Sequence, residues 1–430
     1  MILDAHLQDP DTENLVRDAA LIRAMLDVEA ALARVQGRLG IIPGEAAAQI
    51  DKVAATLKID TAPLSEGVVR DGVPVTALLT RLKEALSPEH RDYVHWGTTS
   101  QDIVDTAMML MLRQAMTLFE QRLENTVKDL AILAESHRGT ILAARTRNQQ
   151  AVPTTLALKI VGWIAPLQRH LRRLGHLKYD LQFGGAGGTL AALGPKGLDV
   201  AAMLAGELQL SLPRLPWHNQ RDNVLEIANW LAGVSGSLGK IAADILMLAQ
   251  TEVGEIRLLG AGRSSALPQK SNPVLAEAIP ALARRNAGLL STMHQSALHH
   301  HERDGAAWTL EWLTLPDMIC TTGSSLLHGL AIARSIEVDK AAMTDNLTPG
   351  LLAEAATYAL AAYMHKSEAQ LLVQDAIRAA SECKREQKDF IDVMSSRITH
   401  PVDWDALRDP ANYLGAANEF VDAVVEEIPK

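Results

Sequence analysis

The segment from Arg263 to Pro273 reads R-S-S-A-L-P-Q-K-S-N-P and places hydroxyl groups, a cation and an amide side by side. Pro268 and Pro273 lack an N–H donor and restrict the residue before them, so this segment does not continue a helix. A lysine ammonium can hold a carboxylate, an asparagine amide adds donors, and a serine can move a proton where its surroundings favour the alkoxide. The pattern indicates a shaped loop that binds a small anion and transfers a proton.

A second polar block, Y-V-H-W-G-T-T-S-Q-D, runs from Tyr93 to Asp102. Thr99 and Ser100 stand before an acidic residue, as at the start of a helix, where free N–H groups can bind an anion. An ordinary helix cap is the alternative. His95 is the titratable histidine nearest to this block, and it is either an orienting core residue or a catalytic one.

Two further blocks carry cations, A-R-T-R-N-Q-Q-A-V-P-T-T (144–155) and H-H-H-E-R-D-G-A-A-W-T-L-E-W (299–312). Consecutive histidines on a helix point about 100° apart, so three of them do not face one metal ion. We expect solvated or packing histidines there, with Arg303 as an anion contact. The glycine cluster F-G-G-A-G-G-T-L (183–190) matches no nucleotide-binding pattern and predicts a flexible connection near the active site.

The composition predicts an all-α protein, because 48% of the 430 residues are hydrophobic, only 4% are aromatic, and Ala and Leu dominate. A net charge of -10 argues against nucleic acid and acidic membranes as partners. Two cysteines, Cys320 and Cys383, suit a reducing compartment and form neither a disulfide framework nor a zinc pattern. With no N-terminal signal and no long apolar run, we expect a cytoplasmic protein without a membrane segment.

Helical periodicity positions these blocks. One amphipathic helix is expected from about 19 to 39, and long helices over 103–178, with an interruption near 145–153, over 223–259 and beyond 272. Helices of this length are buried only against each other, which predicts an antiparallel bundle. We predict three helical domains: residues 1–102, a central long-helix domain over 103–348, and a small domain over 349–430.

The serine-rich loop resembles the signature of the fumarase/aspartase superfamily, G-S-S-x-M-P-x-K-x-N-P, with Arg263 in place of glycine and Leu267 in place of methionine. The other blocks resemble the superfamily's T-S-x-D and R-T-H-x-x-x-A-x-P-T-T segments. The resemblance implies a three-domain all-α fold with a central bundle, a homotetramer whose active sites combine several subunits, and a small polycarboxylate substrate. It implies neither a cofactor nor a metal.

The resemblance also assigns roles. Ser264 would donate or accept the proton at carbon, and Lys270 and Asn272 would bind the adjoining carboxylate. The predicted catalytic residues are Ser264, Lys270 and Glu277; the predicted substrate-binding residues are His95, Thr99, Ser100, Arg147, Gln149, Asn272 and Arg303.

Arg147 stands where the superfamily has the histidine that protonates the departing group. An arginine cannot shuttle a proton. A carboxylate can depart unprotonated, since its conjugate acid has a pKa near ~4, and a guanidinium suits a polyanion. This departure favours the cycloisomerase branch, in which a carboxylate adds within the molecule to a carbon–carbon double bond and forms a lactone during aromatic catabolism. A buried structural ion pair is the alternative role for Arg147.

Other functions are alternatives to this cycloisomerase activity. A muconate bearing a sulfonate instead of a carboxylate is an anion of similar reach. An adenylosuccinate-lyase-like elimination would need a histidine elsewhere in the chain. A non-catalytic helical scaffold is disfavoured, because the loop keeps Ser264, Lys270 and Asn272.

Overall fold

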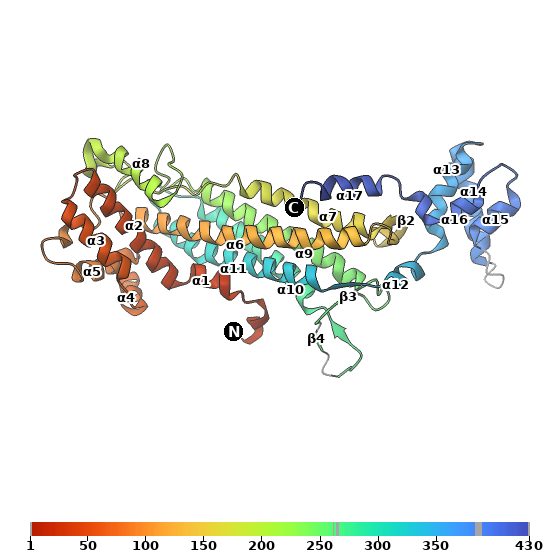
Figure 1. The fold of residues 1–430 in the computed structure, drawn as a ribbon, viewed down its shortest axis with the longest axis horizontal. Helices are drawn as coiled ribbons and strands as arrows, with labels where there is room; N and C mark the ends of the chain where they lie inside the picture. Colours follow the sequence, from red (N-terminus) through yellow and green to blue (C-terminus); the bar gives the residue numbers. More distant parts are fainter. Residues whose placement is uncertain (1, 261, 264–265, 383–388, 429–430) are drawn as a thin grey trace. The chain divides into compact units, whose positions relative to one another are not determined.

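The computed structural model describes residues 2–260, 262–263, 266–382 and 389–428. α-Helices make up most of these ranges, which confirms the all-α prediction (Figure 1). The chain separates into two compact units, unit 1 (Met1–Leu123, His170–Gly239 and Ala278–His328) and unit 2 (Glu124–Arg169, Lys240–Glu277 and Gly329–Lys430). The three-domain division stays a prediction.

Long helices contribute residues to both units: α6 (Ser100–Ser136), α7 (Leu156–Leu174), α9 (Asp222–Leu248), α10 (Val274–Ser296) and α11 (Gly305–Ser335). The further elements of unit 1 are η1 (Ile2–Leu7), α1 (Pro10–Val16), α2 (Asp18–Arg38), α3 (Gly44–Thr56), α4 (Thr61–Asp71), α5 (Val75–Glu84), η2 (Arg91–Tyr93), η3 (Ala191–Lys196) and α8 (Gly197–Leu208).

Helix α2 matches the predicted amphipathic helix. Met25, Val28, Leu32 and Val35 recur at helical spacing, and each is at most 1% exposed. The helix ends before Gly40, whose φ of 62° is a left-handed conformation that glycine adopts without strain. Here sequence periodicity alone determined the element and its buried face.

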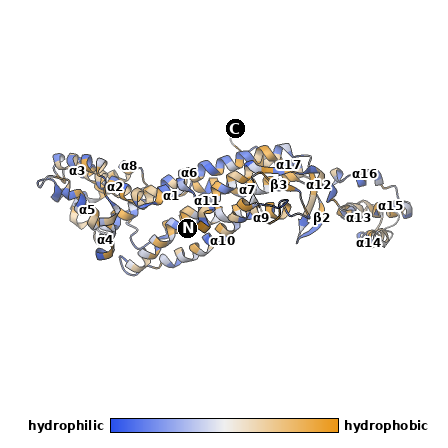
Figure 2. Cartoon of the chain, turned by 90° about the horizontal axis from the view of Figure 1, so that it is seen from below, coloured by the Kyte–Doolittle hydropathy of each residue, from blue (hydrophilic) through white to orange (hydrophobic). Residues whose placement is uncertain are grey.

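The bundle helices of unit 1 are joined by buried polar contacts as well as by apolar packing. Asn286 of α10 is fully buried and donates to Ser235 of α9 (2.7 Å) and Thr322 of α11 (2.8 Å). Gly239 allows α9 to approach α10 closely, since a Cβ there would lie 2.8 Å from Ala283. Figure 2 shows polar and apolar residues interleaved along these long helices, as expected where one face of each helix is buried.

The further elements of unit 2 are β1 (Ile141–Thr146), β2 (Gln149–Thr155), β3 (Ile256–Leu258), β4 (Gly262–Arg263), β5 (Ser271–Asn272), β6 (Ile336–Val338), α12 (Lys340–Asp345), η4 (Pro349–Leu352), α13 (Ala353–Ala361), α14 (Lys366–Glu382), α15 (Phe390–Arg397), α16 (Trp404–Arg408), η5 (Pro410–Tyr413) and α17 (Ala417–Val425). Its strands pair antiparallel as β1–β2, β3–β6 and β4–β5.

In unit 2, α7 is held to α9 by the Trp163 indole N–H, which donates to Asp244 (2.7 Å). The short helices of the C-terminal part have a small core of their own, in which Leu360, Val373 and Phe390 are buried. The helices after Gly350 are shorter than the long bundle helices.

Two local predictions need correction. The interruption near 145–153 is the β1–β2 hairpin, which helical periodicity did not foresee. The histidines 299–301 lie in the loop between α10 and α11 and not on a helix. The ring nitrogens of His299 are enclosed without a hydrogen-bond partner, and burial lowers its pKa.

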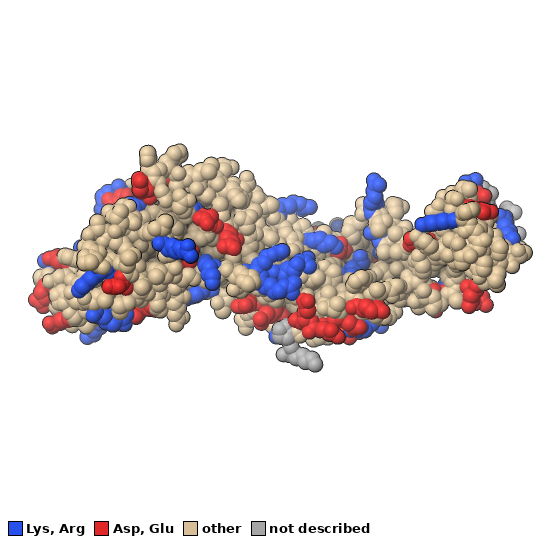
Figure 3. All heavy atoms as spheres, turned by 90° about the horizontal axis from the view of Figure 1, so that it is seen from above, with Lys and Arg blue, Asp and Glu red and all other residues tan. Residues whose placement is uncertain are grey.

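Helix α9 is long and apolar enough to cross a membrane, although half of its most apolar window is buried (50%). A core helix passes the same test, and Ile227, Leu231 and Val234 of α9 are buried within unit 1. Charged side chains of both signs are scattered over the face drawn in Figure 3, so the negative net charge does not form one acidic surface there. Cys320 is a free thiol whose pKa burial raises to about 11; Cys383 lies outside the described residues.

Candidate active site

The predicted site residues belong to both units. Unit 1 holds His95, Thr99, Ser100 and Arg303, and unit 2 holds Arg147, Gln149, Lys270, Asn272 and Glu277. Ser264 lies outside the described residues, so its role in proton transfer stays a prediction.

The start of α6 is organised by Asp102, whose carboxylate is 1% exposed. It accepts hydrogen bonds from the Thr98 hydroxyl (3.0 Å) and the Thr99 backbone N–H (3.1 Å), which closes the helix cap. Within the described part of the chain, the hydroxyls of Thr99 and Ser100 make no hydrogen bond. They stand beside the free N–H groups and positive end of a long helix, where an anion is favoured.

The glycine cluster is tied to the same carboxylate. The backbone N–H groups of Gly184 and Gly185 donate to Asp102 at 2.9 and 2.8 Å. A Cβ on Gly184 would lie 2.7 Å from Pro216, and Gly185 has a φ of 70°, so both positions require glycine. The predicted flexible connection is thus a turn fixed by hydrogen bonds, a role that a search for phosphate-binding motifs does not detect.

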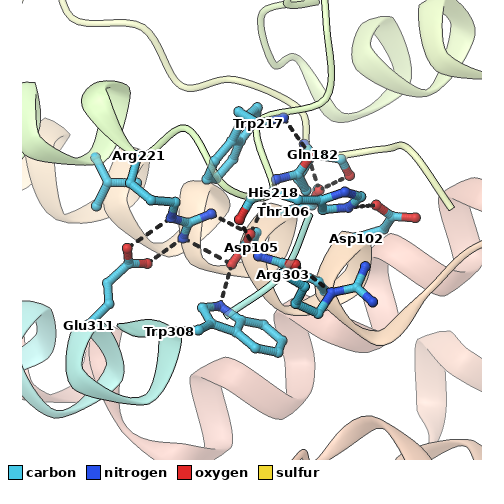
Figure 4. Close-up of polar contacts among 12 residues, drawn as sticks. Asp102, Asp105, Thr106, Gln182, Trp217, His218, Arg221, Arg303, Trp308 and Glu311 are labelled. Carbon is cyan, nitrogen blue, oxygen red and sulfur yellow. Dashed lines mark hydrogen bonds and ion pairs between the residues drawn. The ribbon is translucent and has the colours of Figure 1, made fainter. Parts of the chain in front are cut away.

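Arg303 reaches the same region through Gln101 (Figure 4). Its Nε donates to Gln101 Oε1 (2.7 Å), and Gln101 Nε2 donates to the backbone carbonyl of His218 (2.9 Å). The His218 ring also hydrogen-bonds to Asp102, with 2.7 Å between Nε2 and Oδ1. Arg303 is exposed, and no carboxylate of the described ranges pairs with it, as the predicted anion contact requires.

A buried ionic cluster lies one turn further along α6 (Figure 4). Arg221, just before α9, donates to Asp105 (2.7 and 3.2 Å) and to Glu311 of α11 (3.0 Å from Nε). Asp105 also accepts from the Trp308 indole (2.9 Å) and from Gln182 (3.3 Å). Burial raises the pKa of Glu311, and Arg221 offsets this only in part. The cluster fixes α6, α9 and α11 in one geometry, and sequence reasoning missed it because its partners are far apart in the chain.

His95 is held from α2. Its Nδ1 lies 2.6 Å from an oxygen of Glu29, a carboxylate that is 1% exposed. The residue has a φ of 65°, which is uncommon for a side chain of this size. The contact fits the orienting role left open for His95, and its predicted contact with substrate stays a prediction.

In unit 2, Arg147 and Asn148 form the two-residue turn between β1 and β2, with φ values of 50° and 64°. Two positive φ values define a type I′ turn, where Asn-Gly is the preferred pair and an arginine is strained. Arg147 is exposed, and no carboxylate of the described chain pairs with it, which speaks against the buried structural ion pair. Gln149 is also exposed, and its side-chain amide donates to the Asn148 carbonyl of the same turn (3.1 Å).

The hairpin is anchored two residues before the turn. Arg145 donates to the two oxygens of Glu255 (2.9 and 2.5 Å), a carboxylate that is fully buried. Asn346 Nδ2 donates to the same group (3.0 Å) and to the Val253 carbonyl (2.7 Å). The strained turn is therefore held by a bidentate ion pair at its base.

The serine-rich loop is closed by the pairing of β4 with β5, in which Arg263 lies opposite Ser271 and Gly262 opposite Asn272. Because Arg263 is in a strand, a conformation that any residue adopts, replacing the superfamily's glycine there requires no left-handed backbone. Lys270 is exposed, and its backbone N–H donates to Leu267 (3.1 Å) in a turn.

Asn272 is half-buried at the end of this hairpin, and Glu277 is exposed in the first turn of α10. The Glu277 backbone N–H donates to the carbonyl of Pro273 (3.0 Å), the residue just before α10. Glu277 makes no ion pair within the described ranges. Its predicted catalytic role stays a prediction.

Each unit thus presents cations or donors, on turns at helix or strand ends, that no carboxylate of the described residues neutralises. This arrangement suits a small molecule with several carboxylates. Across the described ranges, no group of three or more His, Cys, Asp or Glu side chains is arranged to hold a metal ion.

Comparison with known proteins agrees with this chemistry. Residues 5–288 match the lyase family model. The chain therefore belongs to the lyase family of the fumarase/aspartase superfamily and is an enzyme of that superfamily. It is 41% identical to a 3-carboxy-cis,cis-muconate cycloisomerase of Pseudomonas aeruginosa, over 99% of this chain and 96% of the relative.

A second relative with that name, from Bradyrhizobium diazoefficiens, is 40% identical over 96% of this chain and 95% of its own length. Among solved structures, the 3-carboxy-cis,cis-muconate lactonizing enzyme of Pseudomonas putida superposes with a TM-score of 0.91 and 38% identity, covering 99% of this chain and 98% of that one. These alignments span nearly the whole chain, so they include the segments that carry the predicted site residues.

Proposed function

We propose that this enzyme is a 3-carboxy-cis,cis-muconate cycloisomerase of aromatic catabolism. One carboxylate of the substrate adds to a carbon–carbon double bond of the same molecule, a C–O bond forms, and the adjacent carbon takes up a proton to give a carboxymuconolactone. The observation that carries the proposal is Arg147, an exposed cation without a carboxylate partner in the described chain, at the position where lyases of this superfamily carry a proton-donating histidine.

The residues divide the task by their chemistry. Lys270, Asn272, Thr99 and Ser100 bind the carboxylate next to the carbon that gains the proton, and their donors stabilise the enediolate charge that develops there. Ser264 delivers the proton, and Arg147 clamps a second carboxylate.

The protein acts as a homotetramer in the cytoplasm, with segments of different subunits completing each site. The described chain supports this assembly in one respect. The helix-end turn of unit 1 and the hairpins of unit 2 each leave donors unpaired, and symmetric association can bring such incomplete sites together. A monomeric variant is expected to be folded and inactive, and full activity in a sedimenting monomer would contradict the composite site.

The test follows the ultraviolet absorbance of 3-carboxy-cis,cis-muconate with purified protein and no added metal. Loss of the conjugated diene absorbance, with a lactone identified by NMR, is the expected result. No turnover of this substrate, together with turnover of adenylosuccinate or of the sulfonate analogue, would contradict the proposal. Ser264→Ala should lower kcat by about 10²- to 10⁴-fold; a loss below about threefold would exclude the serine as the proton carrier.

A further inference from the structure

One ring nitrogen of His218 is hydrogen-bonded to Asp102, and the other has no partner among the described residues. It lies in the loop before α9, is 4% exposed, and places Nε2 at 2.7 Å from Asp102 Oδ1. Its Nδ1 has no hydrogen-bond partner among the described residues and, unlike the nitrogens of His299, it is not enclosed by protein. The polar atoms of a side chain buried this far normally have a hydrogen-bond partner, from the protein or from a bound molecule such as water.

The hydrogen bonds around Asp102 show that His218 is the donor in the contact between them. Its carboxylate already accepts from the Thr98 hydroxyl and from the backbone N–H groups of Thr99, Gly184 and Gly185. A carboxylate among such donors acts as an acceptor, so His218 donates to it from Nε2. The ring orientation is thereby fixed, with Nε2 on Asp102 and Nδ1 without a partner among the described residues.

The ring is also confined sterically. A Cβ on Gly184 would lie 2.9 Å from His218 Cε1, so the glycine turn packs directly on the edge of the imidazole. The backbone of His218 is held as well, because Gln101 donates to its carbonyl while accepting from Arg303. His218 and the guanidinium of Arg303, which pairs with no carboxylate of the described residues, therefore belong to one network around the start of α6 (Figure 4).

We propose that His218 is a further substrate-contacting residue of the anion subsite formed by Thr99, Ser100 and Arg303, and that its Nδ1 binds a substrate carboxylate. In the complex the ring is the imidazolium, which carries a proton on each nitrogen; it lies between two carboxylates, Asp102 and that of the substrate, and donates one N–H to each. This inference rests on the proposed function in one respect, namely that the ligand is a small polycarboxylate.

Two substitutions separate the nitrogens. Gln places its amide nitrogen near the position of Nε2, so His218→Gln retains the donor to Asp102 and loses the group at Nδ1. Asn places its amide nitrogen near the position of Nδ1, so His218→Asn retains a donor toward the substrate and loses the contact with Asp102. Each variant is therefore the control for the other.

The experiment measures the binding of tricarballylate, a tricarboxylate without a double bond, by calorimetry with the full-length protein, together with the melting temperature of each variant. We expect His218→Gln to melt like the wild type and to bind about 10- to 100-fold more weakly. We expect His218→Asn to melt lower and to keep more of the affinity. With the substrate, the loss in His218→Gln should appear mainly in KM.

Affinity of His218→Gln within about threefold of wild type would overturn the inference and leave His218 only holding Asp102. If His218→Gln does not fold, His218→Asn decides, since a loss of affinity there as large as for complete removal of the group in His218→Ala overturns it too. Wild-type protein that binds tricarballylate without converting 3-carboxymuconate would refute the proposed function but not this inference. Wild-type protein that does neither would refute both.

Discussion

Arg147 offers the sharpest test, because its effects on stability and on activity should separate. Its φ of 50° costs an L-residue about 1 kcal/mol or more relative to the right-handed region. Glycine adopts this conformation freely but loses more conformational entropy on folding, about 0.5–1 kcal/mol. Since the two terms have opposite signs, and Arg147 makes no ion pair within the described chain, Arg147→Gly should leave the free energy of unfolding unchanged or raise it by at most about 1.5 kcal/mol.

The effect on catalysis should be much larger. A hydrogen bond to a charged group contributes about 1.5–3 kcal/mol, which corresponds to a loss of about 10- to 150-fold in kcat/KM when the guanidinium is removed. Arg147→Lys keeps the charge without the planar fork and should fall between the wild type and Arg147→Gly.

The assay is the initial rate of 3-carboxymuconate consumption over a range of substrate concentrations, with the melting temperature measured on the same samples. Asn148→Gly is the matched control, because it relieves the second positive φ of the same turn (64°) and should leave kcat/KM unchanged. If Arg147→Gly kept kcat/KM within about threefold of wild type, Arg147 would not be a carboxylate clamp. If Asn148→Gly lost as much as Arg147→Gly, the loss would come from the turn and not from the cation.

Three further predictions concern groups that hold the scaffold. Asp9→Asn removes the buried carboxylate that pairs with Arg122, a guanidinium that also contacts the exposed Asp11 at 3.2 Å, and should lower the free energy of unfolding by about 3–5 kcal/mol in urea titrations; an unchanged midpoint would show that the Asp9–Arg122 pair contributes nothing. Burial alone would raise the pKa of Asp9, but the donors Arg122 and Thr12 outweigh it and hold that pKa below its usual value. Wild-type stability should therefore be complete above the unfolded-state pKa and decline as pH falls through the folded-state pKa, and a decline of equal steepness in Asp9→Asn would contradict this. Glu255→Gln loosens the anchor of the Arg145 hairpin and should lower kcat/KM about tenfold or more, whereas unchanged kinetics would make the anchor irrelevant to the site.

The sequence predicted much of the helical framework because helical periodicity is a local property. Burial of Met25 and Leu32 on one face of α2, and the end of that helix at Gly40, follow from residue spacing and from the conformations that glycine permits. The β1–β2 hairpin was missed for the same reason, since its short strands depend on cross-strand pairing.

In the candidate site, too, the groups found from local motifs differ from those whose roles depend on contacts between distant segments. Local motifs identified Thr99 and Lys270, because a polar turn at a helix end and a proline-bounded loop are visible in a few adjacent letters. Asp102 was read only as the acid of a cap. Its role as the shared acceptor for Gly184 and His218 depends on contacts between segments more than 80 residues apart in the chain.

By itself, the sequence determined the helical class, the turns that carry the predicted anion-binding groups, and the fixed cation at Arg147, since each depends on residue type and short-range spacing. Only the tertiary structure decided which of these groups are free and which are already bound. It placed Glu29 against His95, left Arg147 without a carboxylate in the described chain, and directed one nitrogen of His218 to Asp102 while leaving the other open. A buried polar group bonds to whichever partner the fold brings close to it, and residue spacing along the chain does not identify that partner.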